Sequence, residues 1–209
     1  MASTSSGLMK KIRLAAWAAI AVLAVISGVH LLGEAHKAQQ AGRSLPGAAQ
    51  IGAPFELTRT DGARFSSTSL AGKPYAIFFG FTNCPDICPT TLLEMTNHLK
   101  ALGARADDLN VLFVSIDPER DTPEHLKLYL SAFDPRIIGL TGTLPEVAAV
   151  AKSYRVFYEK VPSKDRSDYT MNHTASVYLM DKTGNLVSTL SFQEPEDARQ
   201  KKLENLLSR

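Results

Sequence analysis

Three kinds of hydrophobic pattern divide the chain. Residues 14–32 form a run of 19 residues without a formal charge, which as a helix is long enough to cross a membrane's hydrocarbon core. Residues 33–50 are mostly small and polar, with the composition of a flexible tether. From residue 51 onward, short apolar runs alternate with segments of helical periodicity. This alternation indicates one globular domain over residues 51–209.

Within this domain the pattern predicts strands and helices in turn. Asp61-Gly62 stands between two alternating runs and indicates a β-hairpin. Apolar runs at residues 74–81 and 109–117 are typical of strands buried on both faces, and a short strand is expected at 136–142. A second hairpin is expected within 174–192, and helices at 90–103, 121–134, 143–160 and 194–208. The order predicts an α/β fold with a central mixed sheet and flanking helices.

Charges on either side of the long apolar run give it an orientation. Lys10, Lys11 and Arg13 precede the run, whereas Glu34 and Lys37 follow it with opposite signs. The positive-inside rule therefore predicts that residues 1–13 are cytoplasmic, that residues 14–32 span the membrane once, and that the domain lies outside.

A cleaved signal peptide is the competing interpretation, because basic residues and an apolar core serve both. The run is longer than a typical signal core, and no clear A-x-A site follows it. No long Arg-rich transit sequence precedes it, so we expect the inner membrane of a bacterium, with the domain in the periplasm.

Net charge excludes one class of partner. After the apolar run, 20 basic residues face 21 acidic ones, so the sequence indicates no basic surface for nucleic acid.

Cys84 and Cys88 are the two cysteines of the chain, and they lie where the strand at 74–81 gives way to a helix. We expect both thiols on one face near the first helical turn, pointing outward, with pKa values lowered by the backbone N–H groups there. A permanent disulfide, a redox-active pair and a pair of soft ligands for copper(I) or zinc are all open. The short loop between the cysteines gains little from closure, which disfavours the permanent disulfide.

Two thiolates need a further donor to complete a metal site, and the chain has five histidines. His173 follows a polar loop and directly precedes the strand expected from residue 174. If that strand neighbours the one at 74–81, His173 lies at the same end of the sheet as the cysteines. The pattern alone leaves open whether His173 is a ligand or an ordinary loop residue. The other histidines have simpler explanations in the apolar run, the tether or helices: His30, His36, His98 and His125.

Three segments in order resemble the Sco/SenC family of membrane-anchored copper proteins with a thioredoxin-like fold. These segments are residues 78–92 with C-x-x-x-C, residues 111–133 with D-P-x-R-D-T, and residues 169–187 with the histidine. The resemblance covers about residues 50–205 and implies a thioredoxin-like sheet. It also implies that Cys84, Cys88 and His173 bind copper as Cu⁺ or Cu²⁺. Asp117 matches a family position near the site, which implies a role outside the ligand set, in copper binding or partner recognition. The alternative is that Asp117 only accepts hydrogen bonds from backbone N–H groups in the turn after the strand.

The resemblance also implies a function. The protein would be a copper chaperone that delivers copper to the binuclear copper centre of a cytochrome c oxidase subunit, with a second periplasmic copper chaperone or a thiol reductant as a further partner. An enzymatic alternative is a thiol–disulfide oxidoreductase that reduces the copper-ligand cysteines of that subunit. A copper or redox sensor is a third interpretation. It would have to signal through a membrane partner, because only about 13 residues are expected in the cytoplasm.

Overall fold

The computed structural model describes residues 17, 27, 50–163 and 168–209. Residues Gln50–Arg209 form one compact unit. The predicted membrane span and tether lie almost entirely outside the described residues. Across the residues that are described, no helix is both long and apolar enough to cross a membrane.

A seven-stranded mixed sheet forms the centre of this unit. β3 (Tyr75–Gly80) pairs parallel with β4 (Asn110–Ser115) and antiparallel with β8 (Val177–Met180). Every residue of β3 is buried, as its continuous apolar run predicts. The strand order is β2-β1-β5-β4-β3-β8-β9. The other four strands are β1 (Glu56–Arg59), β2 (Arg64–Ser66), β5 (Ile137–Thr141) and β9 (Leu186–Leu190).

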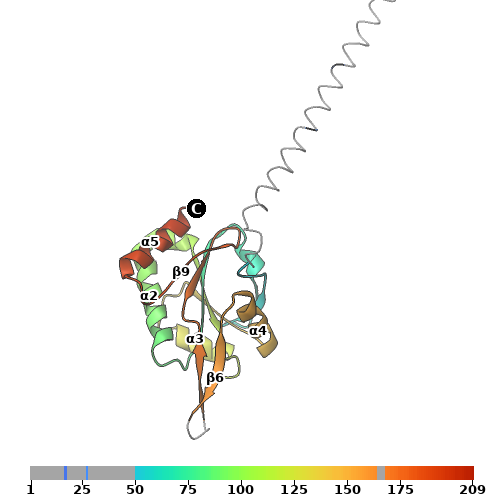
Figure 1. Ribbon diagram of the computed structural model, residues 1–209, viewed down its shortest axis with the longest axis vertical. Helices are drawn as coiled ribbons and strands as arrows, with labels where there is room; N and C mark the ends of the chain where they lie inside the picture. The colour runs from blue at the N-terminus through green and yellow to red at the C-terminus, as the bar shows by residue number, and fades with distance from the viewer. Residues whose placement is uncertain (1–16, 18–26, 28–49, 164–167) are drawn as a thin grey trace, which may run out of the picture. The chain divides into compact units, whose positions relative to one another are not determined.

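Helices flank the sheet. They are α2 (Ile87–Leu102), α3 (Pro123–Leu130), α4 (Leu144–Ser153) and α5 (Glu196–Leu207), with short 3-10 helices at Ser67–Leu70 and Gly103–Asp108. Figure 1 shows α2 and α5 on one side of the strands and α4 on the other. The expected α/β architecture with a central mixed sheet is confirmed.

Two helices begin at threonine caps followed by proline, as their sequences predict. The hydroxyl of Thr122 accepts a hydrogen bond from the backbone N–H of His125 at the start of α3. At the start of α4, Thr143 and Glu146 form a capping box in which each side chain accepts from the other's backbone N–H. These bonds satisfy donors that a first helical turn otherwise leaves unpaired.

The helix predicted over residues 143–160 is wrong in its second half. α4 ends at Ser153, and Arg155 adopts a positive φ of 54°, which takes the chain out of the helix. The aromatic and β-branched residues that follow favour a strand, and β6 (Tyr158–Pro162) pairs antiparallel with β7 (Tyr169–His173). The loop expected before His173 therefore contains a strand. β6 and β7 form a separate two-stranded sheet at one end of the domain (Figure 1).

Candidate metal centre

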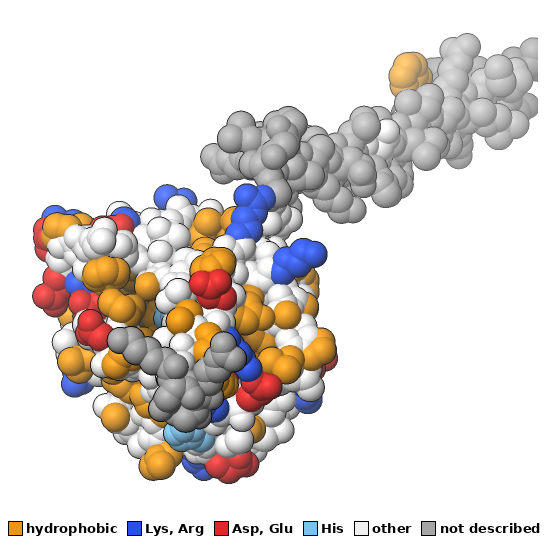
Figure 2. All heavy atoms as spheres, turned by 60° about the horizontal axis from the view of Figure 1, so that its bottom comes forward, with side chains coloured by type: hydrophobic (Ala, Val, Ile, Leu, Met, Phe, Trp, Pro, Cys, Tyr) orange, Lys and Arg blue, Asp and Glu red, His pale blue; other side chains and the backbone are white. Residues whose placement is uncertain are grey.

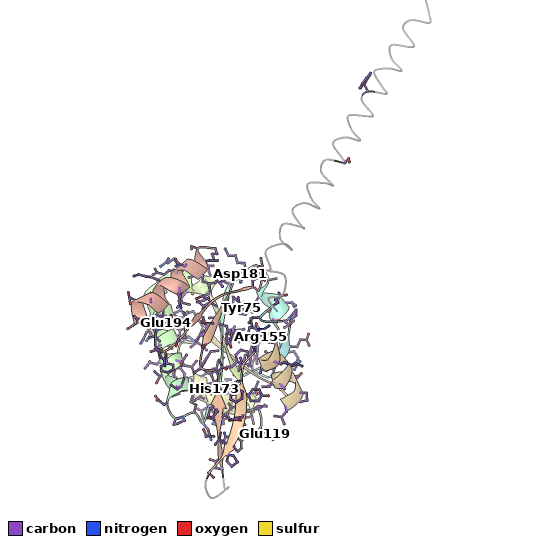
Figure 3. All side chains as sticks on the ribbon, viewed as in Figure 1. Tyr75, Glu119, Arg155, His173, Asp181 and Glu194 are labelled. Atoms are coloured by element: carbon purple, nitrogen blue, oxygen red, sulfur yellow. The ribbon has the colours of Figure 1, made fainter. Side chains whose placement is uncertain are left out.

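The sheet brings three chain segments to one edge. β3 and β4 are parallel, so their last residues, Gly80 and Ser115, lie side by side. β8 is antiparallel to β3, and its first residue, Val177, pairs with Phe78 at the same end. The cysteine loop after β3, the loop after β4 and His173 just before β8 therefore meet. In Figure 3, His173 and Glu119 lie at this end, and Tyr75 and Asp181 at the other.

The two cysteines differ in exposure. Cys84 precedes α2 and is partly exposed, whereas Cys88 lies in the first turn of the helix and is 0% exposed. The expectation that both thiols point outward is therefore wrong for Cys88. Gly80 explains the difference, because a Cβ at that position would lie 2.7 Å from the Cys88 sulfur. The missing side chain leaves the space that the sulfur occupies.

The two thiols also differ in acidity. A hydrogen bond from the Cys88 thiol is the largest cause that lowers the pKa of Cys84, to about 3. The backbone N–H of Cys88 adds to this, with a donor–sulfur distance of 3.4 Å. The same thiol–thiol hydrogen bond, together with burial, raises the pKa of Cys88 far above that of an ordinary thiol. The pKa of Cys84 is therefore lowered as predicted, but mainly by the Cys88 thiol and only in part by backbone N–H groups; the prediction is wrong for Cys88.

His173 is held with one ring nitrogen directed at the cysteines. Its Nδ1 lies 2.9 Å from the carbonyl oxygen of Thr174, and because a carbonyl only accepts, Nδ1 carries the proton. Nε2 is then the nitrogen with a free lone pair, and it lies 3.6 Å from the Cys88 sulfur. The ring packs edge-on against Phe81, with a centroid distance of 5.8 Å. A backbone partner on one nitrogen and a free lone pair on the other is the arrangement of a metal-binding histidine.

The ligand atoms of Cys84, Cys88 and His173 all lie within 4.8 Å of one another. Two sulfurs and an imidazole nitrogen are soft and borderline donors, which suit copper(I) and zinc and exclude a preference for hard ions such as Mg²⁺. The donor set and its free lone pair therefore fit copper. Met95, beneath the cysteines on α2, is buried in the core. His98 on the same helix bonds to Gln200 on α5, 2.7 Å away, and His125 is exposed on α3.

Asp117 is buried and belongs to a network beside the site. It accepts hydrogen bonds from Arg120 Nε at 2.5 Å and from the hydroxyl of Tyr169 at 2.7 Å. Tyr169 is the first residue of β7, the strand that ends at His173. Asp117 thus contacts the histidine's strand rather than the cysteines.

Sequence reasoning missed Asp121, the buried carboxylate that contacts the cysteine loop. It accepts from the backbone N–H of Thr82 at 3.1 Å, from the Thr82 hydroxyl at 2.6 Å and from the Ser115 hydroxyl at 2.6 Å. The D-P-x-R-D-T motif contained the signal, because it holds two aspartates and the sequence analysis places only the first near the site; the second is expected only as a possible helix cap.

Figure 2 shows the end of the domain at which the hairpin projects. Hydrophobic side chains cover much of this face, with charged groups between them, where it is not hidden by atoms drawn in grey. Phe157, directly before β6, is among the large exposed apolar side chains. Its backbone carbonyl accepts from the N–H of Thr174, the residue after His173.

Known proteins resemble the chain in sequence and fold. The ScoI protein of Bradyrhizobium japonicum, solved with copper bound, is 49% identical with a TM-score of 0.69, over 75% of this chain and 99% of that one. BsSco, a member of the Sco family of cytochrome c oxidase assembly proteins in which a disulfide switch was identified, is 26% identical with a TM-score of 0.60, over 77% and 95%. A SCO2-like protein of Rickettsia prowazekii is 43% identical over 136 residues, which are 65% of this chain and 66% of that protein.

The chain spans between 42% and 68% of the length of eight curated relatives that it matches. The SCO1/SenC family model matches residues 43–208, which include the whole of the described sheet and every residue of the candidate site. By fold, by sequence and by its Cys-Cys-His cluster, the chain belongs to the SCO1/SenC family.

Proposed function

We propose that the protein binds copper through Cys84, Cys88 and His173 and delivers it to the binuclear copper centre of a cytochrome c oxidase subunit. The observation that carries the proposal is the cluster itself, in which two sulfurs and the free Nε2 of His173 lie within 4.8 Å. Copper in the solved relative from Bradyrhizobium japonicum supports the choice of metal.

The unequal exposure of the donors suits transfer. Three protein donors complete a trigonal copper(I) site and leave room for an incoming ligand. Cys84 is the partly exposed cysteine, so a thiolate of the recipient would approach the metal on the side of Cys84. Cys88 is buried and would stay bound to the metal while the exchange begins. Ligand exchange then moves the copper without releasing it into water.

The proposed location follows from the N-terminal sequence. Residues 1–13 are cytoplasmic, residues 14–32 anchor the protein in a bacterial inner membrane, and residues 33–50 tether the domain of residues 51–209 in the periplasm. Such an anchor keeps the copper site close to a membrane-bound oxidase. A second periplasmic copper chaperone would supply the copper, or a thiol reductant would keep the two cysteines reduced.

The asymmetry of the thiols favours a second candidate, a thiol–disulfide oxidoreductase acting on the copper-ligand cysteines of the oxidase. Cys84 is a partly exposed thiolate and Cys88 a buried thiol. The Cys84 thiolate would attack a disulfide of the target and form a mixed disulfide. Cys88 would then attack the sulfur of Cys84 while its proton passes to the departing thiolate of the target, which releases the reduced target and leaves a Cys84–Cys88 disulfide for an external thiol reductant. The disulfide switch of BsSco supports this candidate.

Replacing the histidine separates the two functions. His173→Ala removes the nitrogen donor but leaves both thiols, so we expect copper(I) affinity to collapse while thiol–disulfide exchange continues. Competition with a chromophoric copper(I) chelator measures the affinity, and reduction of a model disulfide measures the exchange. His36→Ala, which replaces a histidine of the tether sequence, is the matched control. Unchanged copper affinity in His173→Ala would refute the three-ligand site.

A further inference from the structure

The loop after β4 contacts both halves of the candidate site. On one side it contacts the loop that carries the cysteines, and on the other the β6–β7 hairpin that carries His173. We infer that this loop, together with Ser115 at the end of β4 (residues 115–121), sets the separation between the cysteines and His173, with Asp121 and Tyr169 as positioning residues. The inference rests on the proposed copper function, which it deepens by naming what aligns the ligands.

Asp121 holds the cysteine side. Its carboxylate receives both the backbone N–H and the hydroxyl of Thr82, two residues before Cys84. Asp121 is buried, so these hydrogen bonds form away from bulk water, where losing one is costly. The turn from β3 to Cys84 is thereby fixed to the loop by two bonds from one residue.

Tyr169 holds the histidine side. Its hydroxyl donates to Asp117, and its carbonyl oxygen accepts from Arg120 Nη1 at 2.8 Å. The Arg120 guanidinium also lies over the Tyr169 ring, 3.7 Å from its centroid, a cation–π contact. Lys160 on β6 forms an ion pair with Glu119 of the loop. These contacts bind the hairpin to the loop although its backbone belongs to a separate sheet.

Short internal bonds make the loop one unit. The backbone N–H groups of Arg120 and Asp121 both donate to the carbonyl of Asp117, at 3.1 and 2.9 Å. The Ser115 hydroxyl accepts from the N–H of Asp117 at 3.0 Å and donates to the carboxylate of Asp121. The group that holds the cysteine loop and the group that holds the hairpin are thus fixed relative to each other. A shift of either contact changes the distance between Nε2 of His173 and the sulfurs.

Removing one hydroxyl on the histidine side tests the inference. Tyr169→Phe keeps the ring under Arg120 but deletes the hydrogen bond to Asp117. Tyr75→Phe is the matched control, because it deletes a buried hydroxyl contact, 2.9 Å to Tyr154, at the other end of the sheet. We expect about a 10-fold loss of copper(I) affinity in Tyr169→Phe and none in Tyr75→Phe, as for other residues that orient a metal ligand.

A readout without metal keeps this test separate from the proposed function. Diethyl pyrocarbonate modifies the free nitrogen of neutral histidine, and mass spectrometry resolves His173 from exposed His125 in the same sample. In the copper-free full-length protein, Tyr169→Phe should speed the modification of His173 relative to His125, whereas Tyr75→Phe should not. Thiol–disulfide exchange should stay at the wild-type rate in Tyr169→Phe.

The cysteine side has its own variant. Thr82→Val deletes the hydroxyl that donates to Asp121 at nearly constant volume, and it should change the exchange rate of Cys84 while leaving the modification of His173 as in the wild type.

If Tyr169→Phe behaves like Tyr75→Phe in both copper affinity and histidine modification, the positioning role is wrong. Failure of His173→Ala to weaken copper binding would instead refute the proposed three-ligand copper site, with the metal-free readout still deciding the inference.

Discussion

Gly80→Ala should weaken copper binding, because the added methyl group would displace the sulfur of Cys88 although Cys88 itself is unchanged. The new Cβ would lie 2.7 Å from the Cys88 sulfur and 2.7 Å from Cε2 of Phe113, whereas ordinary contacts begin at 3.4 Å. The sulfur or the ring must therefore retreat by about 0.7 Å, and such overpacking of a core costs about 1–3 kcal/mol. Phe113 and Cys88 are both 0% exposed, so neither can move freely out of the way and the sulfur takes part of the displacement.

The displacement is large on the scale of metal coordination. Metal–ligand distances are held to within about 0.2 Å, so a sulfur that takes even half of the displacement of about 0.7 Å leaves its position for binding metal. A loss of about 10- to 100-fold in copper(I) affinity follows, equal to about 1.4–2.7 kcal/mol, the range found when a ligand loses its alignment.

Gly139→Ala separates this effect from general destabilisation. Gly139 lies in β5, and its new Cβ would clash with Leu130 and Thr60, which are not site residues. Both variants should unfold at lower urea concentration than the wild type, but only Gly80→Ala should lose copper affinity in the chelator competition. Equal copper affinity in the two variants would refute the claim that Gly80 makes room for the Cys88 sulfur.

Two further predictions concern the thiolate and a helix cap. Because the pKa of Cys84 is lowered to about 3, its alkylation by iodoacetamide should stay nearly constant from pH 8 down to pH 5, whereas an ordinary thiol slows by about three orders of magnitude. Peptide mass spectrometry follows the reaction, and a tenfold fall per pH unit would contradict the lowered pKa. Thr143→Ala, which breaks the capping box of α4, should reduce the free energy of unfolding by about 1 kcal/mol in urea without changing copper affinity. A changed copper affinity would show that α4 and the site are coupled.

The sequence predicted the elements whose pattern is local. The apolar run of β3, the Asp61-Gly62 hairpin and the threonine-capped helices each follow from neighbouring residues alone. The helix predicted over residues 143–160 is too long because the helical spacing of α4 continues past Ser153, and the turn at Arg155 carries no glycine or proline to mark it. His173 was placed correctly relative to the cysteines because β8 does neighbour β3.

Other features of the site depend on contacts between distant segments. The burial of Cys88 requires Gly80 from the preceding strand, and helical position alone does not reveal it. The hydrogen bond from Tyr169 to Asp117 joins residues 52 positions apart. A charged residue after a strand looks the same in sequence whether it caps a turn or holds a neighbouring loop. Only the packed structure distinguishes Asp117, which meets the hairpin, from Asp121, which meets the cysteine loop.

The separate sheet of β6 and β7 has an evolutionary consequence. Two of the candidate ligands, Cys84 and Cys88, lie where β3 of the central sheet leads into α2, and most substitutions there disturb the core. The third, His173, is carried by the ribbon that β6 and β7 form, a two-stranded sheet separate from the central one. Descendants of such a protein can lengthen, shorten or replace the ribbon, and so change the affinity for copper or the choice of metal, while inheriting the cysteine scaffold intact. Diversity within the family should therefore concentrate in this ribbon.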